Sequence, residues 1–106
     1  MNMRYMRMIV FFDLPVLTPE SRRNYTRFRK FLIKTGFIMM QESVYCKLVL
    51  NGGNAAAVEA AIRKQAPSEG LVQLLIITEK QFSRIACITG TFKTDVVSSM
   101  ERTVFL

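Results

Sequence analysis

The chain contains no histidine and no tryptophan, and it has only two cysteines and three prolines. The lack of histidine excludes Ser-His-Asp and Cys-His catalysis, histidine general bases and histidine metal ligands. Cys46 and Cys87 match no metal-ligand spacing, which indicates reduced, buried or half-buried thiols in a cytosolic protein. Any chemistry must therefore depend on carboxylates, hydroxyls, lysine, arginine or a bound metal.

Acidic residues are scarce as well, since 8 Asp and Glu stand against 15 Lys and Arg and leave a net charge of +7. This imbalance favours a polyanionic partner, with nucleic acid ahead of a membrane surface, although a merely soluble basic protein has the same composition. The apolar run after Arg4 and Arg7 ends at Asp13, so it is too short for a membrane span or a signal peptide. We therefore expect a cytoplasmic protein without a membrane partner.

Hydrophobic patterning predicts one α+β domain over residues 1–106. Apolar or alternating runs typical of strands occupy residues 5–13, 37–41, 44–50 and 71–78. Helices are expected from Thr18, as N-cap, to Gly36 and over residues 55–65, with Asn54 as the second N-cap. This order is the ferredoxin-like βαββαβ pattern, followed by a helical turn over residues 79–85 and a C-terminal extension strand over residues 103–106.

The first helix has two chemically different faces. At 100° per residue, one face is expected to carry Tyr25, Phe28, Leu32 and Thr35. The opposite arc is expected to carry six cations, Arg22, Arg23, Arg27, Arg29, Lys30 and Lys34. A run of charge is commonly just a solvated face, but six cations opposed by Glu20 alone favour contact with a phosphate backbone.

Asp13 is the candidate for metal chemistry, because it ends an apolar strand and its carboxylate could bind Mg²⁺. An Asp that accepts hydrogen bonds from a loop explains the same position. Phosphodiester hydrolysis with metals commonly takes several carboxylates, so Glu42 or a second copy of Asp13 in a dimer would have to contribute. The hydroxyls of Ser43 and Tyr45 could contact a phosphate or a metal-bound water, but ordinary strand positions explain them better.

Exposed aromatic rings on the sheet would indicate binding of RNA bases. The candidates on the predicted strands are Phe11, Phe12, Phe37 and Tyr45. Packing against helices explains most of these rings better, and the chain carries no RNP-type motif.

Together these segments resemble the small subunit of the CRISPR spacer-integration machinery. The resemblance is carried by RMIVFFDLP at residues 7–15, the basic helix at 22–34, Gly36-Phe37, and ESVY at 42–45. The run TEKQF at residues 78–82 resembles the type II-A branch, and the likeness extends over residues 4–106.

The resemblance implies a homodimer whose C-terminal region, residues 79–106, lies at the dimer or partner interface. It implies a subunit that bridges dimers of a larger integrase and contacts the backbone of a double-stranded DNA prespacer, with RNA as a further partner. Family members are described as Mg²⁺-dependent endonucleases whose metal aspartate matches Asp13. The DNA contacts are expected on Arg22, Arg23, Arg27 and Lys30. The alternatives are a stand-alone metal-dependent endoribonuclease of toxin-like type and a free RNA-binding module.

Overall fold

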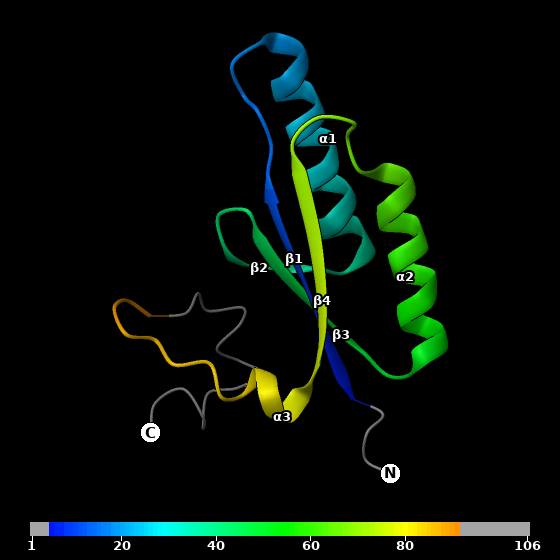
Figure 1. Cartoon of the computed structure of the whole chain (residues 1–106), viewed down its shortest axis with the longest axis vertical. Coiled ribbons are helices and arrows are strands. Elements are labelled where there is room, and N and C mark those ends of the chain that lie inside the picture. The colour runs from blue at the N-terminus through cyan, green and yellow to red at the C-terminus, as the bar shows by residue number, and fades with distance from the viewer. Residues whose placement is uncertain (1–4, 92–106) are drawn as a thin grey trace.

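The computed structural model describes residues 5–91, which form a four-stranded sheet and three helices (Figure 1). The elements in chain order are β1 (Met6–Asp13), α1 (Pro19–Thr35), β2 (Ile38–Gln41), β3 (Val44–Val49), α2 (Gly52–Gln65), β4 (Leu71–Thr78) and α3 (Glu79–Phe82). The strands lie in the order β2-β3-β1-β4, and all neighbours are antiparallel. The predicted ferredoxin-like arrangement is therefore confirmed. The expected strand over residues 103–106 lies outside the described residues.

Helix α1 begins and ends at the residues that the sequence indicates. The Thr18 hydroxyl accepts a hydrogen bond from the Ser21 N–H, and the Ser21 hydroxyl accepts one from the Thr18 N–H, which completes a capping box. Gly36 ends the helix in the left-handed region, with a φ of 110°. Local hydrogen bonds therefore define both ends of α1.

Helix α2 begins earlier than expected. Its N-cap is Asn51, whose side-chain oxygen accepts a hydrogen bond from the Asn54 N–H at 2.8 Å. The expectation that Asn54 caps the helix is therefore wrong. Gly52 and Gly53 form the first turn, because the cap hydrogen bond offsets their weak helix propensity.

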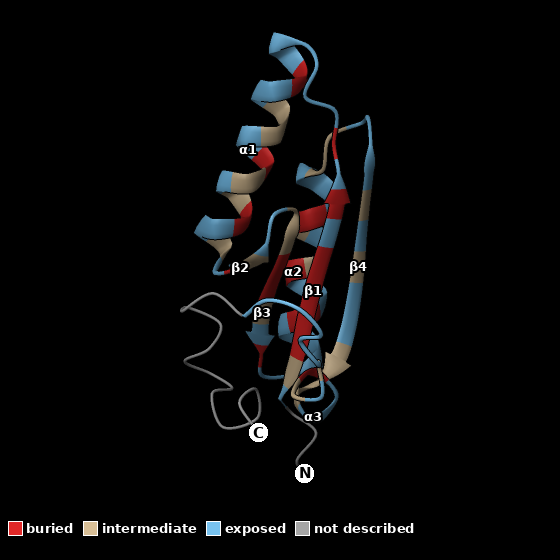
Figure 2. Cartoon of the chain, turned by 90° about the vertical axis from the view of Figure 1, so that its left-hand side faces the viewer, coloured by how far each residue is buried: buried red, intermediate tan, exposed pale blue. Residues whose placement is uncertain are grey.

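The core lies between the sheet and the two long helices, as the buried faces in Figure 2 show. Alternate residues of β1 point into it, and the Phe12 ring packs edge-on against Phe28 and stacks on Tyr45. From α1, Phe28 and Leu32 are buried while Tyr25 and Thr35 are half-buried, which confirms the predicted apolar face. The central strand β1 thus anchors α1 at a fixed position over the sheet.

Among residues 5–91, α3 covers one end of the other face of the sheet. Arg7 lies there with 4% of its surface exposed, and its guanidinium donates to both carboxylate oxygens of Glu79, at 2.9 and 2.6 Å. The same guanidinium lies 4.3 Å from the centre of the fully buried Phe82 ring. Because α3 has only four residues, these contacts, rather than helix propensity, hold it against the sheet.

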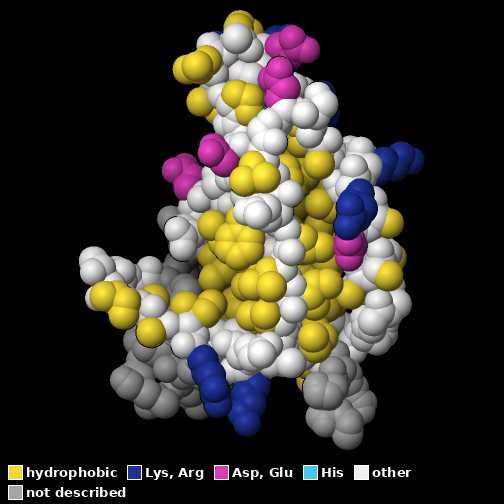
Figure 3. All heavy atoms as spheres, viewed as in Figure 1, with side chains coloured by type: hydrophobic (Ala, Val, Ile, Leu, Met, Phe, Trp, Pro, Cys, Tyr) yellow, Lys and Arg dark blue, Asp and Glu magenta, His cyan; other side chains and the backbone are white. Residues whose placement is uncertain are grey.

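Beyond α3 this face is an exposed hydrophobic surface, seen at the centre of Figure 3. The strand register places its side chains together, since Phe11 pairs with Val44 and Ile9 pairs with both Cys46 and Leu75. The large side chains that remain exposed on this open sheet face are Phe11, Ile38, Leu48, Leu71 and Leu75. Contiguous apolar surfaces on proteins commonly take part in interactions.

Candidate nucleic-acid interface and carboxylate cleft

The basic face of α1 is exposed along the outer side of the helix. Arg22, Arg23, Arg27 and Lys30 are all exposed, and with Pro19 and Thr26 they line a shallow groove of about 610 Å³. Arg22 donates to the main-chain oxygen of Val16 at 3.0 Å, and Arg27 donates to the Asn24 side chain. Within residues 5–91, both salt bridges lie elsewhere, so no carboxylate neutralises these four cations.

Arg29 departs from the predicted six-cation face. It is half-buried, and its guanidinium lies near the Tyr45 phenol. Burial raises the pKa of Tyr45, and the Arg29 charge opposes that rise. Arg29 lies at the edge of the packed face because it follows Tyr25 by one helical turn.

Asp13 is exposed at the end of β1 and lines a cleft of about 170 Å³. The other polar side chains of this cleft are Ser43, from the turn between β2 and β3, and Gln73, from β4. Glu42, which the sequence suggested as a second carboxylate, does not line the cleft. The site is therefore formed by one carboxylate, one hydroxyl and one amide.

The main chain at Asp13 is held from both sides. On one side, the Phe12 N–H donates to the Ser43 oxygen at 3.0 Å. On the other, a Cβ at Gly70 would lie 2.7 Å from the Asp13 oxygen, and Gly70 has a φ of +93°. Only glycine fits this close approach without strain. The loop before β4 and the β2–β3 turn thus fix the Asp13 backbone.

The Asp13 cleft offers few protein ligands for a cation. In the described part of the chain, no group of three or more His, Cys, Asp or Glu side chains could hold a metal ion. Mg²⁺ is commonly bound through one or two carboxylates together with waters and substrate phosphates. One carboxylate with two neutral oxygen donors therefore fits a Mg²⁺ ion whose other ligands are waters and a phosphate. The same set does not fit a cation held by protein ligands alone.

The aromatic candidates divide between the two faces of the sheet. Phe12, Phe37 and Tyr45 are buried in the core, as expected for most of the set. Phe11 is 37% exposed on the open sheet face. Its exposure could not be seen in the sequence, because the apolar residues before and after it are both buried. Its cross-strand neighbours are Val44 and Gln73 rather than other aromatic rings, so the face resembles a packing surface rather than a platform for RNA bases.

The two cysteines also differ. Cys46 is buried, and burial raises its thiol pKa even though the Arg7 charge acts in the opposite direction. Cys87 is exposed, so the expectation that both thiols are at least half-buried is wrong for this residue. It follows α3, where the chain has left the sheet.

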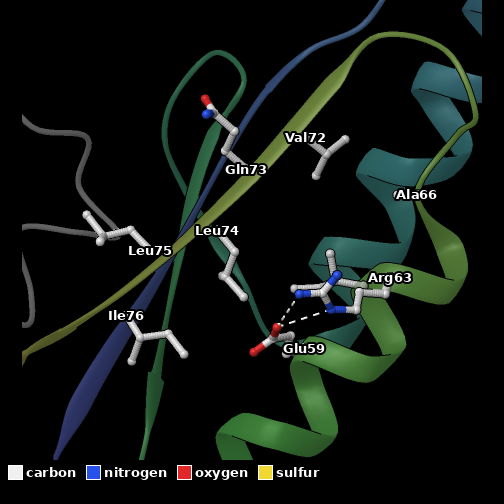
Figure 4. A pocket seen from close by; sticks show the side chains of 9 residues that line it. Glu59, Arg63, Ala66, Val72, Gln73, Leu74, Leu75 and Ile76 are labelled. Carbon is white, nitrogen blue, oxygen red and sulfur yellow. Dashed lines mark hydrogen bonds and ion pairs between the residues drawn. The ribbon is translucent and has the colours of Figure 1, made fainter.

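A groove of about 590 Å³ runs between α2 and β4 (Figure 4). Val72 and Leu74 of β4 lie on the side toward α2, where Glu59 and Arg63 form an ion pair at 2.8 Å. Strand β4 is at the edge of the sheet and has no strand partner on its outer side within residues 5–91. Its free N–H and C=O groups can accept another strand.

The comparisons with known proteins give a consistent result. Residues 6–85 match the family model "CRISPR associated protein Cas2". The chain is 55% identical over 101 residues to a CRISPR-associated endoribonuclease Cas2 of Treponema denticola, covering 95% of this chain and all of the relative. It is 46% identical to one of Streptococcus mutans serotype c, covering 95% of this chain and 93% of the relative.

A solved structure described as "Crystal structure of cas2" has the same fold. It superposes with a TM-score of 0.60 at 23% identity, over 85% of this chain and 92% of the solved one. No helix within the described residues has the length and hydrophobicity needed to cross a membrane.

Proposed function

Because the chain belongs to the CRISPR-associated Cas2 family, we propose that it is the DNA-backbone-binding, bridging subunit of a CRISPR spacer-integration complex. The observation that carries this proposal is the exposed row of Arg22, Arg23, Arg27 and Lys30 on α1, which no carboxylate of the described residues pairs. A subunit of this kind needs to hold a DNA duplex of any sequence. Contacts to phosphates meet that need because they do not depend on which bases the duplex contains.

The binding is expected to be chiefly electrostatic. Arginine forks match phosphate oxygens in pairs, and Lys30 adds a point charge. Arg23 and Arg27 are one helical turn apart on the same exposed side. Each contact releases a condensed counterion, so affinity depends on salt rather than on sequence. The hydrogen bonds of Arg22 and Arg27 to neighbouring oxygens restrict these side chains before binding, which lowers the entropy cost.

The bridging role requires a homodimer, and two surfaces support one. The open sheet face exposes Phe11, Leu71 and Leu75, whose burial against a second copy would remove apolar area from water. The free edge of β4 and the apolar groove beside it could receive residues 103–106 of the partner, whose sequence is TVFL. The open sheet face and the groove meet at β4, so one partner could cover both.

Sedimentation tests this arrangement. We expect a dimer at micromolar concentration, a weaker dimer after deletion of residues 103–106, and a weaker dimer again for Leu75→Glu. Leu75 is 46% exposed on the open sheet face, so a charge there disturbs an interface without unfolding the protomer. A monomeric wild-type protein would contradict the bridging role directly.

A second function, metal-dependent endonuclease activity, is favoured by the Asp13 cleft. Relatives carry the name endoribonuclease, and the cleft offers oxygen ligands beside a fixed main chain. Mg²⁺ bound there would neutralise charge on a phosphate oxygen of the substrate. Asp13 would bind the cation, and in the proposed dimer the cleft would lie beside the interface, because Phe11 and Leu71 line both.

Integration assays with the larger integrase subunit separate the two functions. We expect Asp13→Ala to abolish any Mg²⁺-dependent cleavage and to leave integration intact, because the basic face of α1 is unchanged. The Arg23→Ala/Arg27→Ala variant is expected to show the opposite result, namely a loss of integration with any cleavage retained. If a folded, dimeric Asp13→Ala protein fails to support integration, the bridging proposal is wrong and the cleft is essential.

A further inference from the structure

The β2–β3 turn carries an uncommon backbone conformation. Ser43 has a φ of 70°, and among residues 5–91 no other non-glycine residue has a positive φ. Such a conformation is uncommon for residues other than glycine, and it persists only where the surrounding structure enforces it. In hairpin turns glycine or asparagine commonly takes this position at lower cost.

The left-handed Ser43 places its two oxygens in different roles. Its main-chain oxygen accepts the Phe12 N–H at 3.0 Å, immediately before Asp13. Its side chain lines the same cleft as the Asp13 carboxylate. The turn therefore both orients the end of β1 and supplies a hydroxyl next to it.

Gln73 approaches the cleft from the other side of β1. In the register of β1 and β4, Phe11 pairs with Gln73 and Asp13 pairs with Leu71, so Gln73 is the diagonal neighbour of Asp13 on one face. Gln73 is exposed and lines the cleft, although apolar residues flank it along β4. Gln73 is thus the polar side chain that β4 contributes to this cleft.

We infer that Ser43 and Gln73 are further ligands in the Asp13 cleft, and that they supply neutral oxygen donors to a hydrated divalent cation and the phosphodiester it accompanies. This inference rests on the proposed cation site at Asp13. It assigns to one protomer a set of carboxylate, hydroxyl and amide oxygens from β1, the β2–β3 turn and β4. Hard divalent cations accept all three oxygen types.

Binding of Mn²⁺, a paramagnetic substitute for Mg²⁺, tests the inference without any cleavage assay. In the full-length chain, Gln73→Glu adds a second carboxylate to the cleft and is expected to tighten Mn²⁺ binding by about tenfold. Gln65→Glu is the matched control, because it adds the same charge at the end of α2, outside the cleft. Equal tightening in both variants would overturn the inference, because it would show a general charge effect.

Ser43 requires two substitutions, because its backbone and its hydroxyl have separate roles. Ser43→Gly keeps the left-handed conformation and removes the hydroxyl, so it is expected to fold normally and to weaken Mn²⁺ binding several-fold. Ser43→Asn tolerates the same conformation and returns a side-chain oxygen, so it is expected to restore part of the affinity. Unchanged affinity in Ser43→Gly and Gln73→Leu, with binding lost in Asp13→Ala, would overturn the inference and leave Asp13 as the sole ligand. Equal binding in wild type and Asp13→Ala would instead reject the cation site itself.

Discussion

Removing Glu79 tests how the short helix α3 is held on the sheet. Arg7 is 4% exposed beneath α3, and in Glu79→Ala it loses both hydrogen bonds to the carboxylate. Breaking a fully buried pair in this way costs about 3–5 kcal/mol. Because the Glu79 side chain is 34% exposed, we reduce this to about 2–3 kcal/mol in the free energy of unfolding.

The opposite truncation is expected to cost much less. In Arg7→Met the Glu79 carboxylate regains water, and the thioether can pack against the Phe82 ring. We expect a loss of about 1 kcal/mol or less. The two variants break the same ion pair, so the difference between them isolates the cost of leaving a buried guanidinium unpaired.

Thermal unfolding followed by circular dichroism measures both variants. A loss of about 2–3 kcal/mol in a domain of this size lowers Tm by roughly 10–15 °C. Glu59→Ala is the matched control, because it breaks the Arg63–Glu59 pair, whose arginine side chain is 77% exposed, and should cost about 0.3–0.5 kcal/mol. If Arg7→Met is as destabilising as Glu79→Ala, the buried charge is not what ties α3 to the sheet.

Three further predictions concern the cleft, the thiols and the core. Gly70→Ala should unfold at lower temperature than wild type, because its Cβ would lie 2.7 Å from the Asp13 oxygen at a φ of +93°; an unchanged Tm would contradict the close approach. Iodoacetamide should modify the exposed Cys87 well before the buried Cys46, whose pKa is raised, as mass spectrometry of the intact protein can show; equal rates would refute the burial. Phe28→Ala should cost about 3–5 kcal/mol by denaturant titration, since this ring is 1% exposed in the core; a loss under about 1 kcal/mol would contradict that packing.

Much of the fold could be predicted because local signals agree with the tertiary structure. Thr18, Pro19 and Gly36 mark the ends of α1, and alternation in residues 44–50 correctly identifies β3. The N-cap of α2 was misplaced because asparagine occurs at both Asn51 and Asn54, and only the backbone geometry decides which one caps.

The candidate site could be predicted only in part. Periodicity along α1 identified the exposed cations but not the inward lean of Arg29, which depends on where Tyr45 lies in the folded core. Asp13 was identified by its place after an apolar strand. Ser43 and Gln73 could not be joined to it, because their proximity comes from the pairing of β1 with β3 and β4, and strand register is not visible in a single sequence.

The buried Arg7–Glu79 pair was missed for a similar reason. A cation within an apolar strand is a signal that it needs a partner, because isolated buried charge is costly. The sequence places the two residues 72 positions apart, and only the β1–β4 pairing brings them together.

The basic face of α1 carries the central claim, and the salt dependence of duplex binding tests it most directly. The affinity for a DNA duplex should be measured across a salt series for wild type, Arg23→Ala/Arg27→Ala, and the matched control Arg63→Ala/Lys64→Ala on α2. Each phosphate neutralised contributes about −0.9 to the slope of log affinity against log salt. We predict that the α1 variant flattens this slope by up to about 1.8 units per protomer, while the α2 control leaves it nearly unchanged. Equal slopes in wild type and a folded α1 variant would contradict the claim that α1 contacts the DNA backbone.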